Sequence, residues 1–269
     1  MISTNMKEKI LQNLPTECPW RDTLYWYEAT DSTNTQAKHL AKNGAPQGTT
    51  IIAGHQTGGR GRMGRTFQSP ANVGVYLSVI LRPHCKPEEL MHLTCAAGVA
   101  MVEAVEKVSG VRPQVKWIND LVVGSKKLGG ILTEMSLDKG MVEYAIIGIG
   151  INCLQGKEDF HPEIADLATS LSLAAGRTIT PDVLAAAMME ALWEMSKVLF
   201  TQKAQIMANY KANCITLGKD IQVLRAGDVR PGKAVDLDQD GGLIVEYPDG
   251  RRETVASGEV SVRGMYGYV

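Results

Sequence analysis

The chain has 269 residues, of which 44% are hydrophobic and 21% are charged, a composition typical of ordinary soluble globular proteins. Its 28 basic and 29 acidic side chains leave a formal net charge of −1, which excludes an overall electrostatic attraction to nucleic acid or to anionic lipid. No apolar run approaches the roughly 18 residues that span a bilayer, and the polar start does not resemble a signal peptide. The five cysteines are scattered and form no metal-binding spacing. We therefore expect a cytoplasmic protein with reduced thiols, no membrane partner and no nucleic-acid partner.

The first half of the chain alternates between predicted strands and helices. Residues 1–27 are expected to form a leading strand after a frayed start, because aromatic side chains gather toward the end of this segment. A helix is predicted over Thr33–Asn43, with Ser32 as its N-cap and Gly44 as its stop signal. Further along, the sequence predicts strands at Thr49–Ala53 and Asn72–Leu81 and the longest helix at Pro87–Val108.

The second half continues this alternation up to about residue 217. Val115–Glu134 is expected to form two or three short strands joined by polar turns. Val142–Asn152 contains almost no polar residue, so we predict a strand near the centre of the sheet. Helices are predicted from Pro181 to about Phe200 and then onward to about Asn213.

From Gly218 onward, helical periodicity disappears and short alternating strands are separated by pairs of turn residues. These pairs are Ala226-Gly227, Pro231-Gly232, Gly241-Gly242 and Asp249-Gly250. About fifty residues of this kind predict a small β-barrel. We therefore predict two domains, with residues 1–217 in the first and 218–269 in the second.

The segment Gly58–Phe67, GGRGRMGRTF, carries most of the functional information. Its glycines match GxGxxG, but a dinucleotide-binding fold needs a helix that opens on the last glycine, and the residues after this loop lead into a strand. A protein kinase is excluded because the chain contains no HRD or DFG motif. Glycines allow close backbone approach, and guanidinium groups bind phosphate or carboxylate through two parallel bonds, so the loop predicts a clamp for a polyanion. For this loop taken alone, a solvated basic turn stays open as the alternative.

Three later segments add chemistry that such a clamp would use. Lys116–Asp120, KWIND, places a cation, an amide and a carboxylate at a strand end, which fits a nucleotide with Mg²⁺, although Asn-Asp is also a common turn pair. Lys126–Ile131, KKLGGI, has a lysine before a Gly-Gly turn, which either points into a cleft or marks an exposed hairpin tip. Gly148–Asn152, GIGIN, is a buried strand whose glycines indicate close approach by a ligand or another backbone.

Together and in this order, these segments resemble biotin protein ligases. The resemblance rests on Ser32-Thr33-Asn34, Gln56 with Gly59-Arg60-Gly61-Arg62-x-Gly64-Arg65, Lys116-Trp117-x-Asn119-Asp120, Lys127-Leu128-x-Gly130-Ile131-Leu132-x-Glu134 and Gly148-x-Gly150-x-Asn152. It extends from about residue 28 to the C-terminus and includes Gly258–Arg263 as a final strand. Two positions depart from the usual family pattern, since Ile118 replaces a proline and Phe67 replaces a frequent tryptophan. Both keep an apolar side chain, so we expect activity to be retained.

The resemblance implies a mixed α/β (α+β) sheet similar to class II aminoacyl-tRNA synthetase cores, followed by an SH3-like C-terminal barrel. It implies an adenylate-forming ligase that uses ATP and Mg²⁺ to make biotinyl-5′-AMP. Biotin would then pass to a lysine of a biotin carboxyl carrier protein, or of the carrier domain of acetyl-CoA or pyruvate carboxylase. Many members begin with a DNA-binding winged helix, but only residues 1–31 precede the Ser-Thr-Asn motif, so we expect the monofunctional type. Whether two copies pair as a homodimer through a sheet edge is left open.

The resemblance also implies roles for individual residues. Among the catalytic residues, Lys127 would contact the biotin carboxylate and Lys116 the α-phosphate, while Arg60 and Arg62 clamp both anions. The implied biotin-binding residues are Ser32, Thr33, Asn34, Gln56, Gly59, Arg60, Lys127 and Gly130. The implied ATP- and adenylate-binding residues are Arg62, Arg65, Lys116, Trp117, Asn119 and Asn152. Asp120 is the expected Mg²⁺ ligand.

Two other functions remain open at this point. A lipoate protein ligase has a related core and the same adenylation logic, although the arginine–glycine loop favours biotin. The alternative from a different class is a regulator that binds biotinyl-AMP without catalysis. The expected lack of a DNA-reading segment argues against it.

Overall fold

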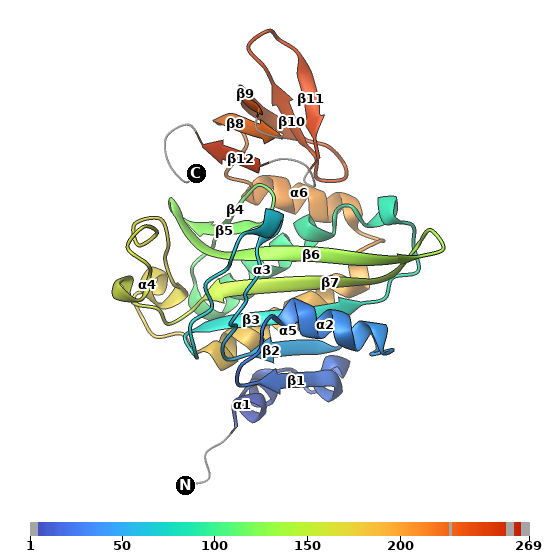
Figure 1. Ribbon diagram of the computed structural model, residues 1–269, viewed down its shortest axis with the longest axis vertical. Helices are drawn as coiled ribbons and strands as arrows, with labels where there is room; N and C mark the ends of the chain where they lie inside the picture. Colours follow the sequence, from blue (N-terminus) through green and yellow to red (C-terminus); the bar gives the residue numbers. More distant parts are fainter. Residues whose placement is uncertain (1–4, 226–227, 257–260, 265–269) are drawn as a thin grey trace.

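A seven-stranded mixed sheet forms the centre of the molecule, with its strands in the order β1-β2-β3-β7-β6-β5-β4. The computed structural model describes residues 5–225, 228–256 and 261–264, the last of these as backbone (Figure 1). The strands are β1 (Leu24–Tyr27), β2 (Thr50–Ala53), β3 (Gly74–Leu81), β4 (Gln114–Lys116), β5 (Asp120–Val123), β6 (Lys126–Asp138) and β7 (Met141–Asn152). β1 and β2 run parallel, and the other neighbouring pairs in this sheet are antiparallel.

Strand β7 lies in the middle of this sheet, between β3 and β6, as the apolar composition of Val142–Asn152 predicts. Every residue from Tyr144 to Ile149 is buried. A central strand is covered on both faces and therefore needs apolar side chains on both. The mixed α/β class expected from the sequence is confirmed.

Helices cover the two faces of the sheet (Figure 1). Helix α2 (Thr33–Lys42) packs over β2, β3 and β7 through a small apolar cluster that includes Ile80 and Ile146. On the opposite face, α3 (Leu93–Ser109) and α5 (Pro181–Val198) pack against each other within the main core. The remaining helices are α1 (Met6–Asn13), α4 (Leu171–Ala175), α6 (Lys203–Asn213) and the 3-10 helices η1 (Pro19–Thr23), η2 (Arg62–Gly64), η3 (Pro87–Leu90) and η4 (Lys157–Asp159).

Three local predictions need correction. The segment 1–27 is not a strand throughout, because α1 and η1 precede β1 and the Asn5 side chain caps α1 by accepting from the backbone of Lys7 at 2.9 Å. The helix expected from Pro87 begins at Leu93, since η3 is a separate 3-10 helix. The expected Gly-Gly turn lies inside β6, and the hairpin instead turns at Gly124, whose φ of 61° favours glycine.

A second sheet follows, with five antiparallel strands in the order β11-β10-β9-β8-β12. The strands are β8 (Asp220–Arg225), β9 (Asp228–Leu237), β10 (Leu243–Glu246), β11 (Arg252–Val255) and β12 (Ser261–Gly264). This sheet corresponds to the small C-terminal β-structure expected from the turn pairs, but Pro231-Gly232 was wrongly predicted as a turn and lies inside β9, paired with β8. The predicted turn Ala226-Gly227 and residues 258–260 of the expected final strand lie outside the described residues.

The second sheet rests against α6 and the corner between β4 and β5 (Figure 1). At this corner the Trp117 indole N–H donates to the Gly241 carbonyl at 2.9 Å, and the Trp117 backbone N–H donates to Thr216 Oγ1 at 2.9 Å. Lys203 of α6 forms an ion pair with Asp240. The Trp117–Gly241 bond attaches the C-terminal β-structure to the Lys-Trp-x-Asn-Asp motif, and the Lys203–Asp240 pair attaches it to α6.

Two further sequence-based points concern thiols and membranes. The five cysteines are all buried and free, at Cys18, Cys85, Cys95, Cys153 and Cys214. In the part of the chain that the structure describes, no helix combines the length and the apolar character needed to span a bilayer.

Candidate functional site

A pocket lies between the arginine-rich loop, the N-terminus of α2 and strands β5, β6 and β7. The predicted site residues that line it are Ser32, Thr33, Asn34, Gln56, Arg60, Arg62, Arg65, Asn119, Asp120, Lys127 and Gly130. The other lining residues are Gly61, Met63, Thr66, Phe67, Ile131, Leu132, Gly148, Ile149 and Gly150. Segments that are far apart in the sequence are gathered here because their strands are neighbours in the sheet.

The loop Gly58–Phe67 folds back on itself at the edge of this pocket. The Gly61 N–H donates to the Arg65 carbonyl at 2.7 Å, and the Phe67 N–H donates to the Gly59 carbonyl at 2.9 Å. Only the short η2 turn interrupts the loop, and no helix opens on Gly64. The dinucleotide-binding arrangement is therefore absent from this described loop, as the sequence predicts.

Two glycines of β7 make room for side chains that shape the pocket floor. A Cβ atom on Gly148 would lie 1.9 Å from Asn34 Oδ1, and a Cβ atom on Gly150 would lie 2.4 Å from Phe67 Cε1. The sequence indicated close approach by a ligand or another backbone, whereas the structure places two side chains against these glycines. The Phe67 ring packs edge-on against Tyr76, with ring centroids 6.4 Å apart.

The cations of the pocket bind polar partners within the chain. Lys127 Nζ lies 2.7 Å from Asp120 Oδ1, and Arg62 donates to Asn119 Oδ1 at 3.0 Å. Burial lowers the pKa of Arg62, and the nearby Asp120 carboxylate opposes that shift. Arginine nevertheless stays protonated in proteins, so the pocket carries fixed positive charge that an anion can use.

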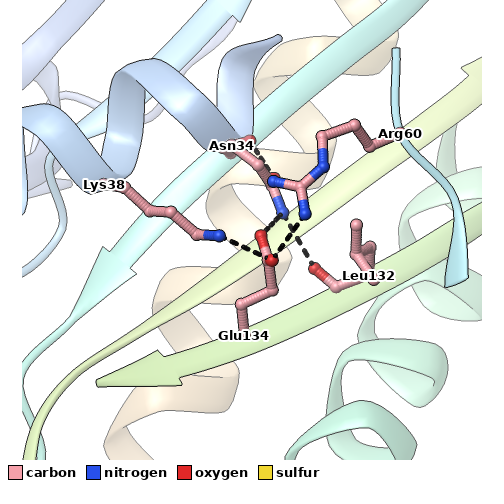
Figure 2. A network of polar contacts seen from close by, with 6 residues as sticks. Asn34, Lys38, Arg60, Leu132 and Glu134 are labelled. Carbon is pink, nitrogen blue, oxygen red and sulfur yellow. Dashed lines mark hydrogen bonds and ion pairs between the residues drawn. The ribbon is translucent and has the colours of Figure 1, made fainter. Parts of the chain in front are cut away.

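Glu134 joins the arginine-rich loop to helix α2 (Figure 2). Its Oε1 accepts from Lys38 at 2.6 Å and from Arg60 at 3.1 Å, and its Oε2 accepts from Asn34 at 2.9 Å. Burial raises the pKa of Glu134, but the hydrogen bonds from Lys38 and Asn34 outweigh that effect and lower the pKa below its usual range. Glu134 is therefore ionised at neutral pH and holds Arg60 in place.

The pocket wall at the start of α2 is polar and buried. Ser32 and Thr33 are each 3% exposed at the start of α2. Ser32 occupies the predicted N-cap position, but its side chain makes no capping hydrogen bond. Gln56 Oε1 accepts from the Thr33 backbone N–H at 2.8 Å, and Gln56 Nε2 donates to Ser69 Oγ at 2.8 Å.

Some of the predicted site residues do not line this pocket, namely Gly59, Lys116, Trp117 and Asn152. Gly59 is buried within the loop, where a Cβ atom would lie 2.4 Å from the Phe67 carbonyl oxygen. Lys116 ends β4 and is half-buried, and Trp117 is buried with its indole bonded to the second sheet. The Asn152 amide donates to the Thr169 carbonyl at 3.0 Å.

A neighbouring pocket shares Thr66, Phe67 and Lys127 with the first, and Asn152 lines it. Its other lining residues are Gln68, Pro70, Gln155, Asp159, Phe160, Ile164 and Ala168. The segment 155–168 is fixed beside Lys127, whose backbone N–H donates to the Leu167 carbonyl at 2.7 Å. Sequence reasoning missed this segment because it carries no recognisable motif, and its closeness along the chain to Asn152 was the one available signal.

Comparison with known proteins identifies the relatives of this chain. Residues 26–152 match the model of the biotin/lipoate A/B protein ligase family, and residues 216–263 match the biotin protein ligase C-terminal domain. The bifunctional ligase/repressor BirA of Bacillus subtilis is 36% identical over 228 residues, covering 84% of this chain and 70% of that protein. The biotin–[acetyl-CoA-carboxylase] ligase of Mycobacterium tuberculosis is 32% identical over 239 residues, covering 86% of this chain and 85% of that protein.

Solved structures agree with the sequence relatives. The biotin protein ligase of Aquifex aeolicus in complex with biotin and ATP is similar with a TM-score of 0.75 and 30% identity, covering 90% of this chain and 99% of that one. The likeness confirms the class II synthetase-like fold expected for the large sheet. On these matches and the shared motifs, the chain belongs to the biotin protein ligase family of adenylate-forming enzymes.

Proposed function

We propose that this chain joins biotin and ATP to give biotinyl-5′-AMP and pyrophosphate, and then transfers biotin to a lysine of a biotin carboxyl carrier protein. The observation that carries the proposal is the convergence of Lys127, Arg60 and Arg62 on one pocket beside the buried hydroxyls of Ser32 and Thr33. A carboxylate and a triphosphate repel each other as they approach. Preorganised cations offset that repulsion and typically lower such barriers by about 3–4 kcal/mol for each group.

The pocket suits biotin because polar groups and apolar side chains line it together. We place the biotin ring against Ser32, Thr33 and Gln56, with its carboxylate at Lys127 and Arg60. Phe67 and Ile131, which line the same pocket, would supply apolar contact to the rest of the biotin molecule. Asn34 and Gly130 shape the walls without contributing charge, and Gly59, which does not line the pocket, lets the loop approach the Phe67 backbone closely.

The neighbouring pocket suits the nucleotide. We place the adenosine beside Asn152 and the α-phosphate near Lys127, which is shared by the two pockets. Arg62, Arg65 and Asn119 are assigned to the phosphates. Lys116 and Trp117 line neither pocket but lie three and two residues before Asn119, so we propose that they act on the nucleotide by positioning that amide.

The residues present fit a magnesium ion that arrives with ATP. Asp120 lines the pocket, and Mg²⁺ commonly binds one or two protein carboxylates together with substrate phosphates. Within the described residues there is no cluster of three or more His, Cys, Asp or Glu side chains, which fits an ion bound jointly with the nucleotide. When bound, it would neutralise phosphate charge, and Asp120 would exchange its ion pair with Lys127 for the metal.

The proposed reaction has two steps, each of which forms one bond and breaks another. In the first step a biotin carboxylate oxygen bonds to the α-phosphorus, and the bond from that phosphorus to the β-bridging oxygen breaks to release pyrophosphate. In the second step the acceptor lysine, as a neutral amine, attacks the anhydride carbonyl, AMP leaves, and a proton is lost from nitrogen. We propose that the arginine loop closes over the anhydride in between and keeps water and stray amines away.

The domain organisation is also proposed as two units, 1–217 and 218–269. It is supported by the start of β8 at Asp220 and by the second family match, which begins at residue 216. The buried, free cysteines support a reducing, cytoplasmic location.

The proposal is tested by incubating the protein with biotin, Mg-ATP and a purified biotin carboxyl carrier domain, followed by mass measurement of the carrier. A mass gain of one biotinyl group on the carrier lysine is expected. Labelling with lipoate in place of biotin would identify a lipoate ligase. Tight binding of biotinyl-AMP without carrier labelling or pyrophosphate exchange would identify a non-enzymatic regulator.

A further inference from the structure

The turn between β4 and β5, residues 117–119, is supported from behind by the segment 213–216, which leads from α6 toward the second sheet. The Ile215 N–H of this segment donates to the Val115 carbonyl at 2.9 Å, and a parallel bridge joins the segment to β4. The next contact is the bond from the Trp117 N–H to Thr216 Oγ1. None of the segment's residues, all of which the structure describes, lines either pocket of the site. The turn therefore has a support that takes no direct part in binding.

A further contact to the turn comes from Tyr210 of α6. Its hydroxyl donates to the Ile118 carbonyl at 3.0 Å, and the side chain is fully buried. The ring is packed closely against α3, because a Cβ atom on Gly98 would lie 3.3 Å from Tyr210 Cε2. Burial raises the pKa of Tyr210 well above its usual range, and Asp120 adds to this shift whereas Arg62 opposes it. The hydroxyl therefore keeps its proton and acts as a donor, within electrostatic range of both pocket residues.

A fixed Ile118 carbonyl fixes the way in which the chain enters Asn119. The peptide unit is planar, so the Ile118 oxygen and the Asn119 N–H belong to one rigid group. While Tyr210 holds the oxygen, this group cannot rotate, and the Asn119 side chain leaves the backbone in one direction. That side chain donates from Nδ2 to the Ile131 carbonyl at 3.1 Å and accepts at Oδ1 from Arg62 at 3.0 Å.

The partners of the Asn119 amide determine its orientation. A carbonyl oxygen only accepts, so the amide nitrogen faces Ile131 and the amide oxygen faces Arg62. A line of contacts thus runs from α6 through one peptide group and one amide to the arginine loop. A buried carbonyl that loses its donor is costly, and rotation of its peptide group is one way to find a new partner. Such a rotation would carry the Asn119 side chain away from Arg62.

We propose that Tyr210 is a positioning residue that, through the Ile118–Asn119 peptide group, places Arg62 for the nucleotide step and for retention of the adenylate. The inference rests on the proposed function, in which Arg62 and Asn119 bind the phosphates. It gives a task to α6, whose residues line neither pocket of the site. Binding of biotin without ATP should depend little on Tyr210, because the residues assigned to the biotin ring lie at the start of α2 and at Gln56.

Tyr210→Phe removes the hydroxyl and keeps the ring that packs against Gly98. With the full-length protein, biotin-dependent pyrophosphate exchange gives kcat and KM, and calorimetry gives the dissociation constant of biotin without ATP. Release of AMP without a carrier, with pyrophosphatase present, reports escape and hydrolysis of the adenylate. We expect the KM for Mg-ATP and the rate of AMP release each to rise by about fivefold, with the affinity for biotin alone within about twofold of the wild type. A purely structural role would lower the amount of active protein and leave KM unchanged.

Asn213→Ala is the matched control on the same segment. Asn213 is buried and accepts from the Arg112 side chain at 3.2 Å, so its loss also removes a hydrogen bond but leaves the bond from Tyr210 to Ile118 in place. We expect a lower Tm, with the KM for Mg-ATP and the rate of AMP release within about twofold of the wild type.

If Tyr210→Phe does not fold, Thr216→Val serves as the second variant, because it removes the acceptor of the Trp117 N–H on the same turn. It should raise the same two quantities. Wild-type values of both in the folded variants would overturn the inference, and so would a loss of affinity for biotin alone as large as the rise in the KM for Mg-ATP. Absence of pyrophosphate exchange in the wild type would instead refute the proposed function.

Discussion

Replacing Gly148 by alanine should damage the pocket floor because the new Cβ atom would lie 1.9 Å from Asn34 Oδ1. That amide cannot move without giving up its bonds to Ser78 and Glu134. A hydrogen bond to a neutral partner contributes about 1 kcal/mol and one to a charged partner about 2 kcal/mol, so we expect a loss of roughly 3 kcal/mol in unfolding free energy. For a protein of this size such a loss lowers Tm by about 6–12 °C.

Gly150→Ala is the matched control on the same strand. Its Cβ atom would lie 2.4 Å from Phe67 Cε1, but Phe67 is half-buried and its ring can rotate away. We expect a loss below about 1.5 kcal/mol together with weaker biotin binding, because the ring would move into the pocket. Thermal denaturation followed by circular dichroism, with calorimetry for biotin, measures both effects. A Tm for Gly148→Ala within about 2 °C of the wild type would refute the view that Asn34 is rigidly held.

Four further outcomes are expected. Lys127→Ala should reduce biotin-dependent pyrophosphate exchange by at least about 100-fold in a protein that stays folded, and normal exchange would remove Lys127 from the chemistry. Arg62→Gly should release activated biotin onto unrelated proteins, which blotting with an avidin probe detects; labelling confined to the carrier would contradict the role of the loop. The pKa of Glu134 is lowered in the folded protein, so its ionised carboxylate contributes to stability at neutral pH. That contribution is lost as the pH falls below about 4.3, the usual pKa of a glutamate in an unfolded chain. Urea unfolding should therefore show the wild type losing its advantage over Glu134→Gln in acid. Trp117→Phe removes the indole bond to Gly241 and should cost about 1 kcal/mol, measured as a lower denaturation midpoint.

Local patterns predicted much of the fold. The apolar run Val142–Asn152 predicted a central strand, and β7 is the central strand. Ser32 and Gly44 bracketed a helix that the structure places at Thr33–Lys42. These predictions work because burial on both faces and the ends of helices leave marks within a few neighbouring residues. The N-terminal helix α1 was missed, since the aromatic residues that suggested a strand lie after it.

The arrangement of side chains around the site required the tertiary structure. Arg60 and Glu134 are 74 residues apart in the sequence, and Asn34 and Glu134 are 100 residues apart, yet each pair is in hydrogen-bond contact. No spacing rule connects them, because their meeting depends on how β6 pairs with β7 and on where α2 packs. The same holds for the segment 155–168, which forms a pocket only because it lies beside Lys127.

The sequence by itself determined the family and the chemical types of the groups at the site, because close backbone approach needs glycine and the binding of anions needs fixed cations. Only the tertiary structure decided which groups bind each other, including the bond from Tyr210 to the Ile118 carbonyl and the ion pair between Lys127 and Asp120. The physical reason is that the residue types follow from local chemistry, whereas the partners follow from the long-range register of the strands.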